Sequence, residues 1–155
     1  MTCTPCAHDA AADLWRRFCA ACGAEEIRRA FDYPATFLFP LPTEQIWTAH
    51  VGALEVGWLS FVPDPSGTSV STRAGMFPAY RRRGLWREIL EELRRAAFSD
   101  PAVHAVRAMV LLSNAAHAER MLAMTQVVPW YRFDGLSLHP PAYHIITRRE
   151  DWEAR

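Results

Sequence analysis

The sequence predicts a mixed α/β (α+β) fold, in which a central sheet is flanked by helices, behind a small N-terminal module rich in cysteine. Alternating apolar and polar residues between 45 and 77 indicate successive strands joined by short turns. Between residues 68 and 98, a strand leads into an arginine-rich turn and an amphipathic helix. All four cysteines stand in the first 22 residues. We therefore predict two units, residues 1–31 and residues 32–155.

The composition is that of one globular domain with a small appendage. The chain has 155 residues, of which 50% are hydrophobic, enough for a core. Its 17 acidic and 17 basic residues cancel, which argues against nucleic acid as a partner. No apolar run reaches membrane length, and no basic stretch followed by an apolar one marks a signal peptide. We expect a cytoplasmic protein with no membrane partner.

The cysteines form two pairs with metal-ligand spacing, Cys3 with Cys6 and Cys19 with Cys22. Two such knuckles supply four thiolates for a tetrahedral zinc ion, and the second pair, followed by Gly23, resembles a zinc-ribbon knuckle. Disulfides are disfavoured in the cytosol, and no strand signal precedes either pair as in thioredoxin-like redox motifs. The pattern predicts structural zinc, because four thiolates leave no coordination position open.

The elements follow in chain order. Residues 10–18 fit a helical turn or a short hairpin equally, residues 25–31 a short helix, and the proline-bearing residues 35–41 a linker or an edge strand. Period-2 alternation and turn residues define three strands, and an apolar run defines a fourth. The expected later elements are strands 45–51, 55–62 and 68–77, a helix to about residue 98, a strand 105–112, a helix 115–124, and a hairpin of 127–133 with 142–148.

The arginine turn is the strongest chemical signal. Arg81, Arg82 and Arg83 stand after a strand and just before Gly84 and the helix. Free N–H groups and partial positive charge at a helix N-terminus attract phosphate, and arginines add fork-shaped donors. Glycine lets backbone approach a ligand closely. The turn is therefore predicted to bind a pyrophosphate. The alternative is that its arginines are only exposed to solvent.

This stretch resembles the coenzyme A motif of the GNAT acyltransferase family, Gln/Arg-x-x-Gly-x-Gly/Ala after a strand. Arg81 to Trp86 take the motif positions, with Trp86 in place of the small residue. The resemblance covers Thr43 to Arg149 and implies a mostly antiparallel sheet in which two parallel strands splay apart. The coenzyme-binding residues that it implies are Met76, Phe77, Arg81, Arg82, Arg83, Gly84, Leu85, Trp86 and Asn114.

The resemblance also implies a reaction. An acyl group, with acetyl-CoA as the expected donor, would pass to an amine by direct attack on the thioester, while a backbone N–H near Met76 polarises its carbonyl. The family often has a tyrosine as acid where this chain has Met121. Tyr131 and His117 are the remaining candidates for the acid. Candidate bases, none singled out by spacing, are Glu44, Glu55, His50 and His144.

Two classes of function remain open from the sequence. One is an N-acyltransferase with an unidentified small-molecule or protein amine. The other is a catalytically weak or inactive acyl-CoA-binding protein, whose zinc module binds a partner or a second subunit in a homodimer. The absent tyrosine at Met121 favours the second class. Only about twenty residues separate Cys22 from the first strand of the meander, so we expect a shortened acceptor wall, or the zinc module in its place.

Overall fold

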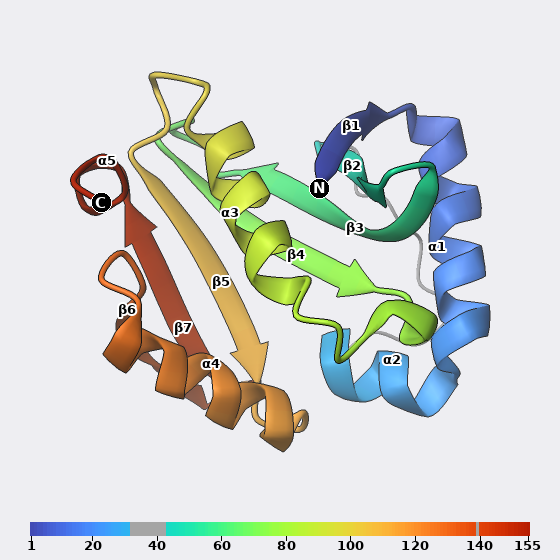
Figure 1. Cartoon of the computed structure of the whole chain (residues 1–155). Helices are drawn as coiled ribbons and strands as arrows, with labels where there is room; N and C mark the ends of the chain where they lie inside the picture. The colour runs from blue at the N-terminus through green and yellow to red at the C-terminus, as the bar shows by residue number, and fades with distance from the viewer. Residues whose placement is uncertain (32–42, 139) are drawn as a thin grey trace.

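The structure, a computed structural model, describes residues 1–31, 43–138 and 140–155. Its strands form one sheet in the order β1-β2-β3-β4-β5-β7-β6 (Figure 1). The elements are β1 (Thr2–Cys6), α1 (His8–Cys22), α2 (Ala24–Phe31), β2 (Gln45–Val51), β3 (Leu54–Pro63), β4 (Ser69–Met76), the 3-10 turn η1 (Pro78–Tyr80), α3 (Trp86–Ala97), β5 (Ala105–Leu111), α4 (Ala115–Val127), β6 (Arg132–Leu138), β7 (Pro141–Arg148) and α5 (Arg149–Glu153).

The sheet is mixed and mostly antiparallel, as predicted. Each pair of neighbouring strands is antiparallel except β4 with β5, which run parallel. The bounds of β2, β3 and β4 agree closely with the predicted strands, but β3 is buried without alternation from Val56 to Phe61. The C-terminal hairpin differs from the prediction, because α4 continues to Val127 and the first hairpin strand starts only at Arg132. α5 was not predicted, although its Trp152 is buried in the core.

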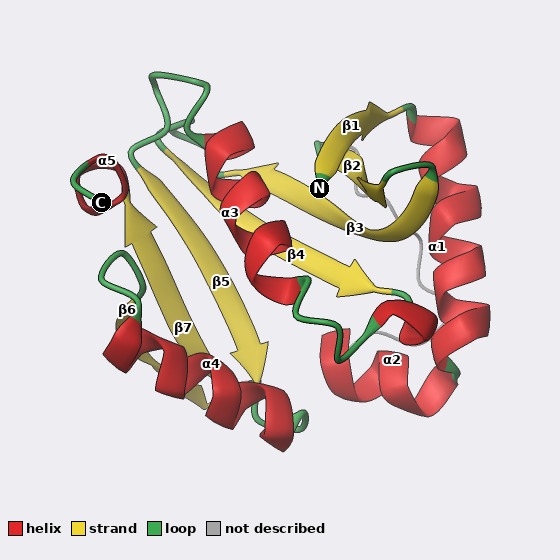
Figure 2. Cartoon of the chain, viewed as in Figure 1, coloured by secondary structure: helices red, strands yellow, loops and turns green. Residues whose placement is uncertain are grey.

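Helices cover both faces of the sheet. Trp58 and Leu59 are neighbours on β3, so their side chains point to opposite faces. Trp58 packs with Trp15 and Phe18 of α1, whereas Leu59 shares a core cluster with Leu93 of α3. Figure 2 shows α3 and α4 in front of the sheet and α1 along its right side. The two cores are therefore separated by the sheet itself.

The N-terminal residues differ most from the prediction. The first cysteine pair lies on β1, an edge strand that pairs with β2, and the second lies on the last turns of α1. The predicted helix at residues 25–31 is confirmed as α2. Among the described residues, a strand and two helices thus precede the meander, and residues 1–31 hold no cluster of side chains that could bind a metal. Whether residues 1–31 and 32–155 fold as two units stays a prediction.

Two further predictions concern a linker and membrane-spanning segments. The predicted linker or edge strand at residues 35–41 lies outside the described residues. In the described ranges, no helix combines the length and the apolar character that a membrane span requires.

Two glycines allow a close approach of backbone at the end of β4. A Cβ at Gly57 would collide with the carbonyl oxygen of Gly75, its near neighbour across the β3–β4 ladder. A Cβ at Gly75 would collide with the side chains of Trp58 and Phe18. The position of the β4 end therefore depends on the absence of both side chains.

Replacing Gly57 with alanine should destabilise the fold, because the obstacle is backbone that cannot rotate away. We expect a loss of about 2 kcal/mol in the free energy of unfolding, the usual cost of forcing a methyl group into a packed site. Denaturant unfolding measures it. The control is Gly52→Asn, at a turn with φ of 60° and no atom near a Cβ. Equal stability of the two variants would contradict the close approach.

Candidate functional site

β4 and β5 separate partway along their length. Their parallel pairing extends only from Ser69 opposite Ala105 to Thr72 opposite Ala108. β4 continues to Met76 and β5 to Leu111 without pairing to each other. Figure 1 shows the two arrowheads pointing apart, with the first turns of α3 and α4 near them. The splay that the sequence resemblance implied is confirmed, and we call this opening the β4–β5 gap.

The backbone of Met76 faces the gap. Along a strand, successive residues direct their N–H and C=O groups to opposite sides. Phe77 N–H donates to the Val56 carbonyl of β3 at 3.0 Å, and the Thr68 carbonyl accepts from His104 N–H beside β5 at 2.8 Å. Even-numbered residues therefore turn their N–H groups toward β5. Since pairing ends at Thr72, the N–H of Met76 points into the gap.

The arginine turn that follows exposes a row of backbone donors. Arg82 has φ of 61° and Gly84 φ of 79°, both left-handed, so the chain turns sharply before α3. A Cβ on Gly84 would meet no atom, so it is the left-handed conformation, rather than a lack of space, that favours glycine there. The first helical bond at this end runs from Ile89 N–H to Leu85 C=O, at 3.1 Å. Within the described chain, the N–H groups of residues 82–88 donate to no acceptor.

The three arginines of the turn differ in their contacts. Arg82 and Arg83 are exposed, and the Arg83 guanidinium lies 5.6 Å from the centroid of the Tyr80 ring. Arg81 is half-buried and donates from Nε to the Met76 carbonyl at 2.9 Å. Its other nitrogens contact Cys22 and Glu26. Two of the three arginines are thus available to an anion at the turn, and the third is bound within the protein.

Trp86 and His117 meet at the first turns of α3 and α4. Their rings are perpendicular, with centroids 5.3 Å apart, and the buried indole N–H of Trp86 has no acceptor in the described chain. Burial lowers the pKa of His117 to about 4, with a smaller contribution from the charge of Arg120. The backbone N–H of His117 donates to the backbone carbonyl of Asn114, between β5 and α4, at 3.0 Å. His117 is therefore a neutral imidazole at pH 7.

Tyr131, the other candidate acid, lies in the core. It is 1% exposed, and the guanidinium of the fully buried Arg94 stands 4.4 Å from the centroid of its ring. Its hydroxyl has no hydrogen-bond partner in the described chain. Burial raises the pKa of Tyr131 to about 12. A phenol with a raised pKa gives up its proton less readily, so this environment opposes an acid role at neutral pH.

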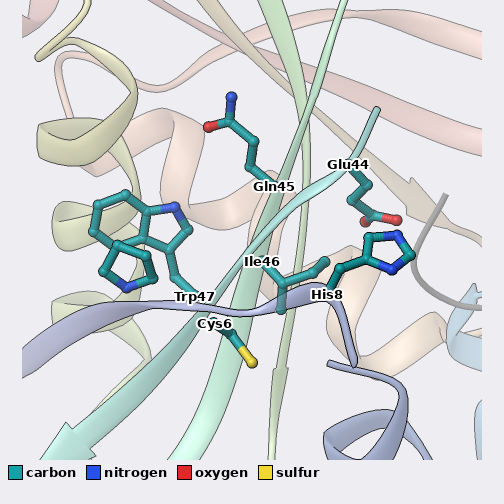
Figure 3. A pocket seen from close by; sticks show the side chains of 7 residues that line it. Cys6, His8, Glu44, Gln45, Ile46 and Trp47 are labelled. Carbon is teal, nitrogen blue, oxygen red and sulfur yellow. The ribbon is translucent and has the colours of Figure 1, made fainter. Parts of the chain in front are cut away.

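Glu44, a candidate base, is already engaged. Its carboxylate accepts from Ser60 and forms an ion pair with Arg73. Glu44 lines a cavity of about 380 Å³ together with His8 at the start of α1 and residues of β1 and β2. Figure 3 shows these side chains. β3 separates those strands from β4 and β5 in the sheet order. This cavity is therefore distinct from the β4–β5 gap.

The other candidate bases lie in different places. Glu55 accepts from Arg17 at 2.7 Å and lines a second cavity, of about 450 Å³, with Phe77 and Tyr80. His50 is hydrogen bonded to Thr48 on β2, and His144 stands on β7 opposite Met109 of β5. The predicted coenzyme-binding residues and His117 thus lie around the gap, whereas the candidate bases lie in several separate places. Only Glu55 among the four adjoins the residues that follow Met76.

Comparison with solved structures finds similar chains. An aminoglycoside acetyltransferase, AAC(6')-Ib, in complex with coenzyme A and kanamycin, superposes with a TM-score of 0.75 at 14% identity, over 99% of this chain and 97% of that one. A spermidine N-acetyltransferase from Vibrio cholerae, with CoA and spermine, gives 0.75 at 9% identity, over 98% and 97%. The chain has the fold of these acetyltransferases.

A third similar structure is smu.2055 from Streptococcus mutans UA159, with a TM-score of 0.67 at 16% identity, over 96% of this chain and 99% of that one. No protein-family model matches the sequence, and no curated protein matches it either. The fold likeness spans nearly the whole chain, so β1, α1 and α2 belong to the shared architecture.

The predicted zinc site is not supported. Among the described residues, no three His, Cys, Asp or Glu side chains lie close enough to hold a metal ion. The four cysteines, Cys3, Cys6, Cys19 and Cys22, are free and pack against apolar clusters. A strand presents alternate residues to opposite faces and a helix presents every third or fourth to one face. The spacing that suggested knuckles therefore has an ordinary packing origin.

Metal removal tests this correction. We expect a strong chelator to leave the thermal unfolding midpoint unchanged, because no metal is needed to hold β1 and α1 in place. Metal analysis of the purified chain should find well under one zinc per chain. A stoichiometric zinc, together with a fall in the midpoint on chelation, would restore the thiolate site.

His117 should make stability depend on pH. Its folded pKa lies below the ordinary value of 6.5, so the unfolded chain takes up a proton first as the pH falls. Stability is complete above about pH 6.5 and declines toward pH 4. The loss should be at most about 3 kcal/mol relative to His117→Gln, which has no ring to protonate. Parallel unfolding curves at pH 7 and pH 4.5 measure the difference, and equal pH dependence would show that His117 is hydrated.

Proposed function

We propose that the protein is an acyl-CoA-dependent N-acyltransferase, with acetyl-CoA as the expected donor. One observation carries the proposal: a backbone N–H in the β4–β5 gap stands next to a turn whose donors are unpaired. The first can polarise a thioester carbonyl, and the second can bind a pyrophosphate. The similar structures support it, since AAC(6')-Ib is an aminoglycoside acetyltransferase and the Vibrio cholerae enzyme a spermidine N-acetyltransferase, both in complex with coenzyme A.

The acyl-CoA donor would bind along a path that runs from the arginine turn into the β4–β5 gap. Its pyrophosphate would accept from the N–H groups of residues 82–88, and the exposed Arg82 and Arg83 would add positive charge. The pantetheine arm would lie in the gap and satisfy the strand N–H and C=O groups that lack a partner there. The thioester carbonyl would then accept from the N–H of Met76. Leu85, Trp86 and Asn114 would border this path from the first turns of the two helices.

This geometry would support the transfer. A neutral amine nitrogen would attack the thioester carbon, and the Met76 N–H would stabilise the negative charge that forms on oxygen. The C–S bond would then break, the acyl group would stay on nitrogen as an amide, and the nitrogen proton would pass to the released thiolate. Of the two predicted catalytic groups, only His117 lies beside the gap, but its pKa of about 4 leaves the imidazole neutral at pH 7, without a proton to give to the thiolate. Tyr131 remains a proposal that its raised pKa opposes.

The acceptor class is an amine. Kanamycin and spermine, the molecules bound in the two similar enzymes, both carry several amino groups. In this chain, the carboxylate of Glu55 and the rings of Phe77 and Tyr80 line one cavity. Arg17 also lines it, pairs with Glu55 and lies over the Phe77 ring. A carboxylate beside aromatic faces suits a cationic amine. A homodimer and a cytoplasmic location stay predictions.

The reaction can be tested with a panel of amines. We expect acetyl-CoA to release free thiol in the presence of polyamines or aminoglycosides, with the amide product seen by mass spectrometry. Thiol release without any amine measures background hydrolysis and serves as the control. Coenzyme A binding without release for any amine would favour a binding protein over an enzyme.

The phosphate site can be tested by charge. The variant Arg82→Glu with Arg83→Glu should weaken coenzyme A binding at least tenfold in calorimetric titration, because a phosphate would meet two like charges. The fold should be unaffected, since both side chains are exposed. The matched control is Arg16→Glu on α1, also an exposed arginine. Unchanged affinity in the double variant would show that the turn is only a solvated loop.

A further inference from the structure

Arg81 connects the end of β4 to the corner between α1 and α2. Its Nε donates to the Met76 carbonyl at 2.9 Å, its Nη2 to the Cys22 sulfur at 3.1 Å, and its Nη1 pairs with Glu26 at 2.6 Å. We propose that Arg81 is a positioning residue for the transfer reaction, one that fixes the Met76 backbone and couples it to α1 and α2. This inference rests on the proposed function.

The peptide between Met76 and Phe77 is held at both ends. Its N–H donates to the Val56 carbonyl of β3 at 3.0 Å, and its carbonyl accepts from Arg81. Because a peptide unit is planar, two bonds on opposite sides fix its orientation. The Met76 N–H lies in the preceding peptide plane, which is joined to this one through the φ and ψ angles of Met76, so fixing one plane restrains the other. Donors that stabilise a transition state must be held in place before the reaction begins.

The other end of the contact is the α1–α2 corner. Cys22 is the last residue of α1, Glu26 lies in the first turn of α2, and Gly23 between them has φ of 82°. The guanidinium therefore contacts both helices. A shift of either helix, for instance when an amine binds beside them, would reach Met76 through one side chain.

These contacts distinguish Arg81 from its neighbours. A guanidinium has five N–H donors, and here all three of its nitrogens are engaged. A turn toward a phosphate would break three interactions and leave the partly buried Glu26 without its cation. Arg82 and Arg83 are exposed and reach an anion without such a cost. The phosphate role that the motif suggested for all three therefore belongs to those two.

Cys22 serves in this arrangement as a hydrogen-bond acceptor. Burial raises the pKa of its thiol to about 11, so the group is protonated at neutral pH and is a poor nucleophile. A neutral sulfur still accepts a weak hydrogen bond from a guanidinium. Serine in its place would keep an acceptor, whereas alanine would remove it. The pair of variants thus separates the hydrogen bond from simple packing.

Arg81→Gln is the main test, with Arg83→Gln as its matched control. After wild-type coenzyme A binding and amine transfer are measured, we expect Arg81→Gln to lower kcat at least tenfold while the Kd for coenzyme A changes less than threefold. Arg83→Gln should do the reverse, raising Kd with kcat kept. Arg81→Lys should recover part of kcat, since one ammonium can still donate to the Met76 carbonyl.

A second measurement does not need an acceptor. In amide NMR spectra, the Met76 and Phe77 signals should move in Arg81→Gln and in Cys22→Ala, and much less in Cys22→Ser. Thermal unfolding midpoints identify any variant that fails to fold. Such a variant is replaced by Glu26→Gln, which keeps the Arg81 guanidinium and weakens only its contact with residue 26.

Two results would overturn the inference. One is a tenfold loss of coenzyme A affinity in Arg81→Gln equal to that in Arg83→Gln, which would make Arg81 a phosphate ligand. The other is an Arg81→Gln variant with unchanged kcat and unchanged Met76 signals. Failure of the wild-type chain to bind coenzyme A would instead overturn the proposed function, and the two failures are therefore distinguishable.

Discussion

The loss of pairing between β4 and β5 is the constraint on which the site depends. A backbone N–H or C=O group that is buried without a partner costs roughly 1–3 kcal/mol, so sheets normally continue their ladders. Here the ladder ends at Thr72, whose hydroxyl donates to the Arg107 carbonyl at 3.0 Å and closes the last paired position. Beyond it, the strand ends keep polar groups that a ligand with amides of its own can satisfy. In the proposed function, the opening would therefore offer the ligand a surface made of backbone groups.

The rest of the molecule keeps β4 in place although one side of its end is unpaired. On one face, Phe18 and Trp58 pack edge to face with ring centroids 5.6 Å apart, directly where a Cβ on Gly75 would lie. On the other, Met76 is buried with Ile89 of α3. Close packing transmits strain, because interiors lack the free volume to absorb it. A strand held from both faces stays in position when one neighbour departs.

Local patterns predicted the middle of the chain well and the N-terminus poorly, for a physical reason. Strands β2 to β4 carry alternating residues bounded by turn residues, so their extents are visible in sequence even though β3 buries both of its faces from Val56 to Phe61. In α1 the apolar stripe was also present: Ala11, Leu14, Trp15, Phe18 and Cys19 are all buried. Cys19 and Cys22 belong to that stripe, since cysteine packs as a small apolar residue. Because the metal interpretation treated both cysteines as zinc ligands, they were not counted as apolar residues, and the helix was not predicted from its apolar stripe.

The roles of the three arginines in the turn could not be predicted from the sequence, because they depend on tertiary contacts. Arg81, Arg82 and Arg83 are chemically identical, and a motif treats them as one basic run. What separates them is a helix corner 59 positions earlier in the chain, where Cys22 meets Arg81. Likewise nothing local indicates that Arg94, on a helix with other arginines, is fully buried over Tyr131. A residue's chemical role here follows from which of its donors the fold has already engaged, and that depends on tertiary contacts.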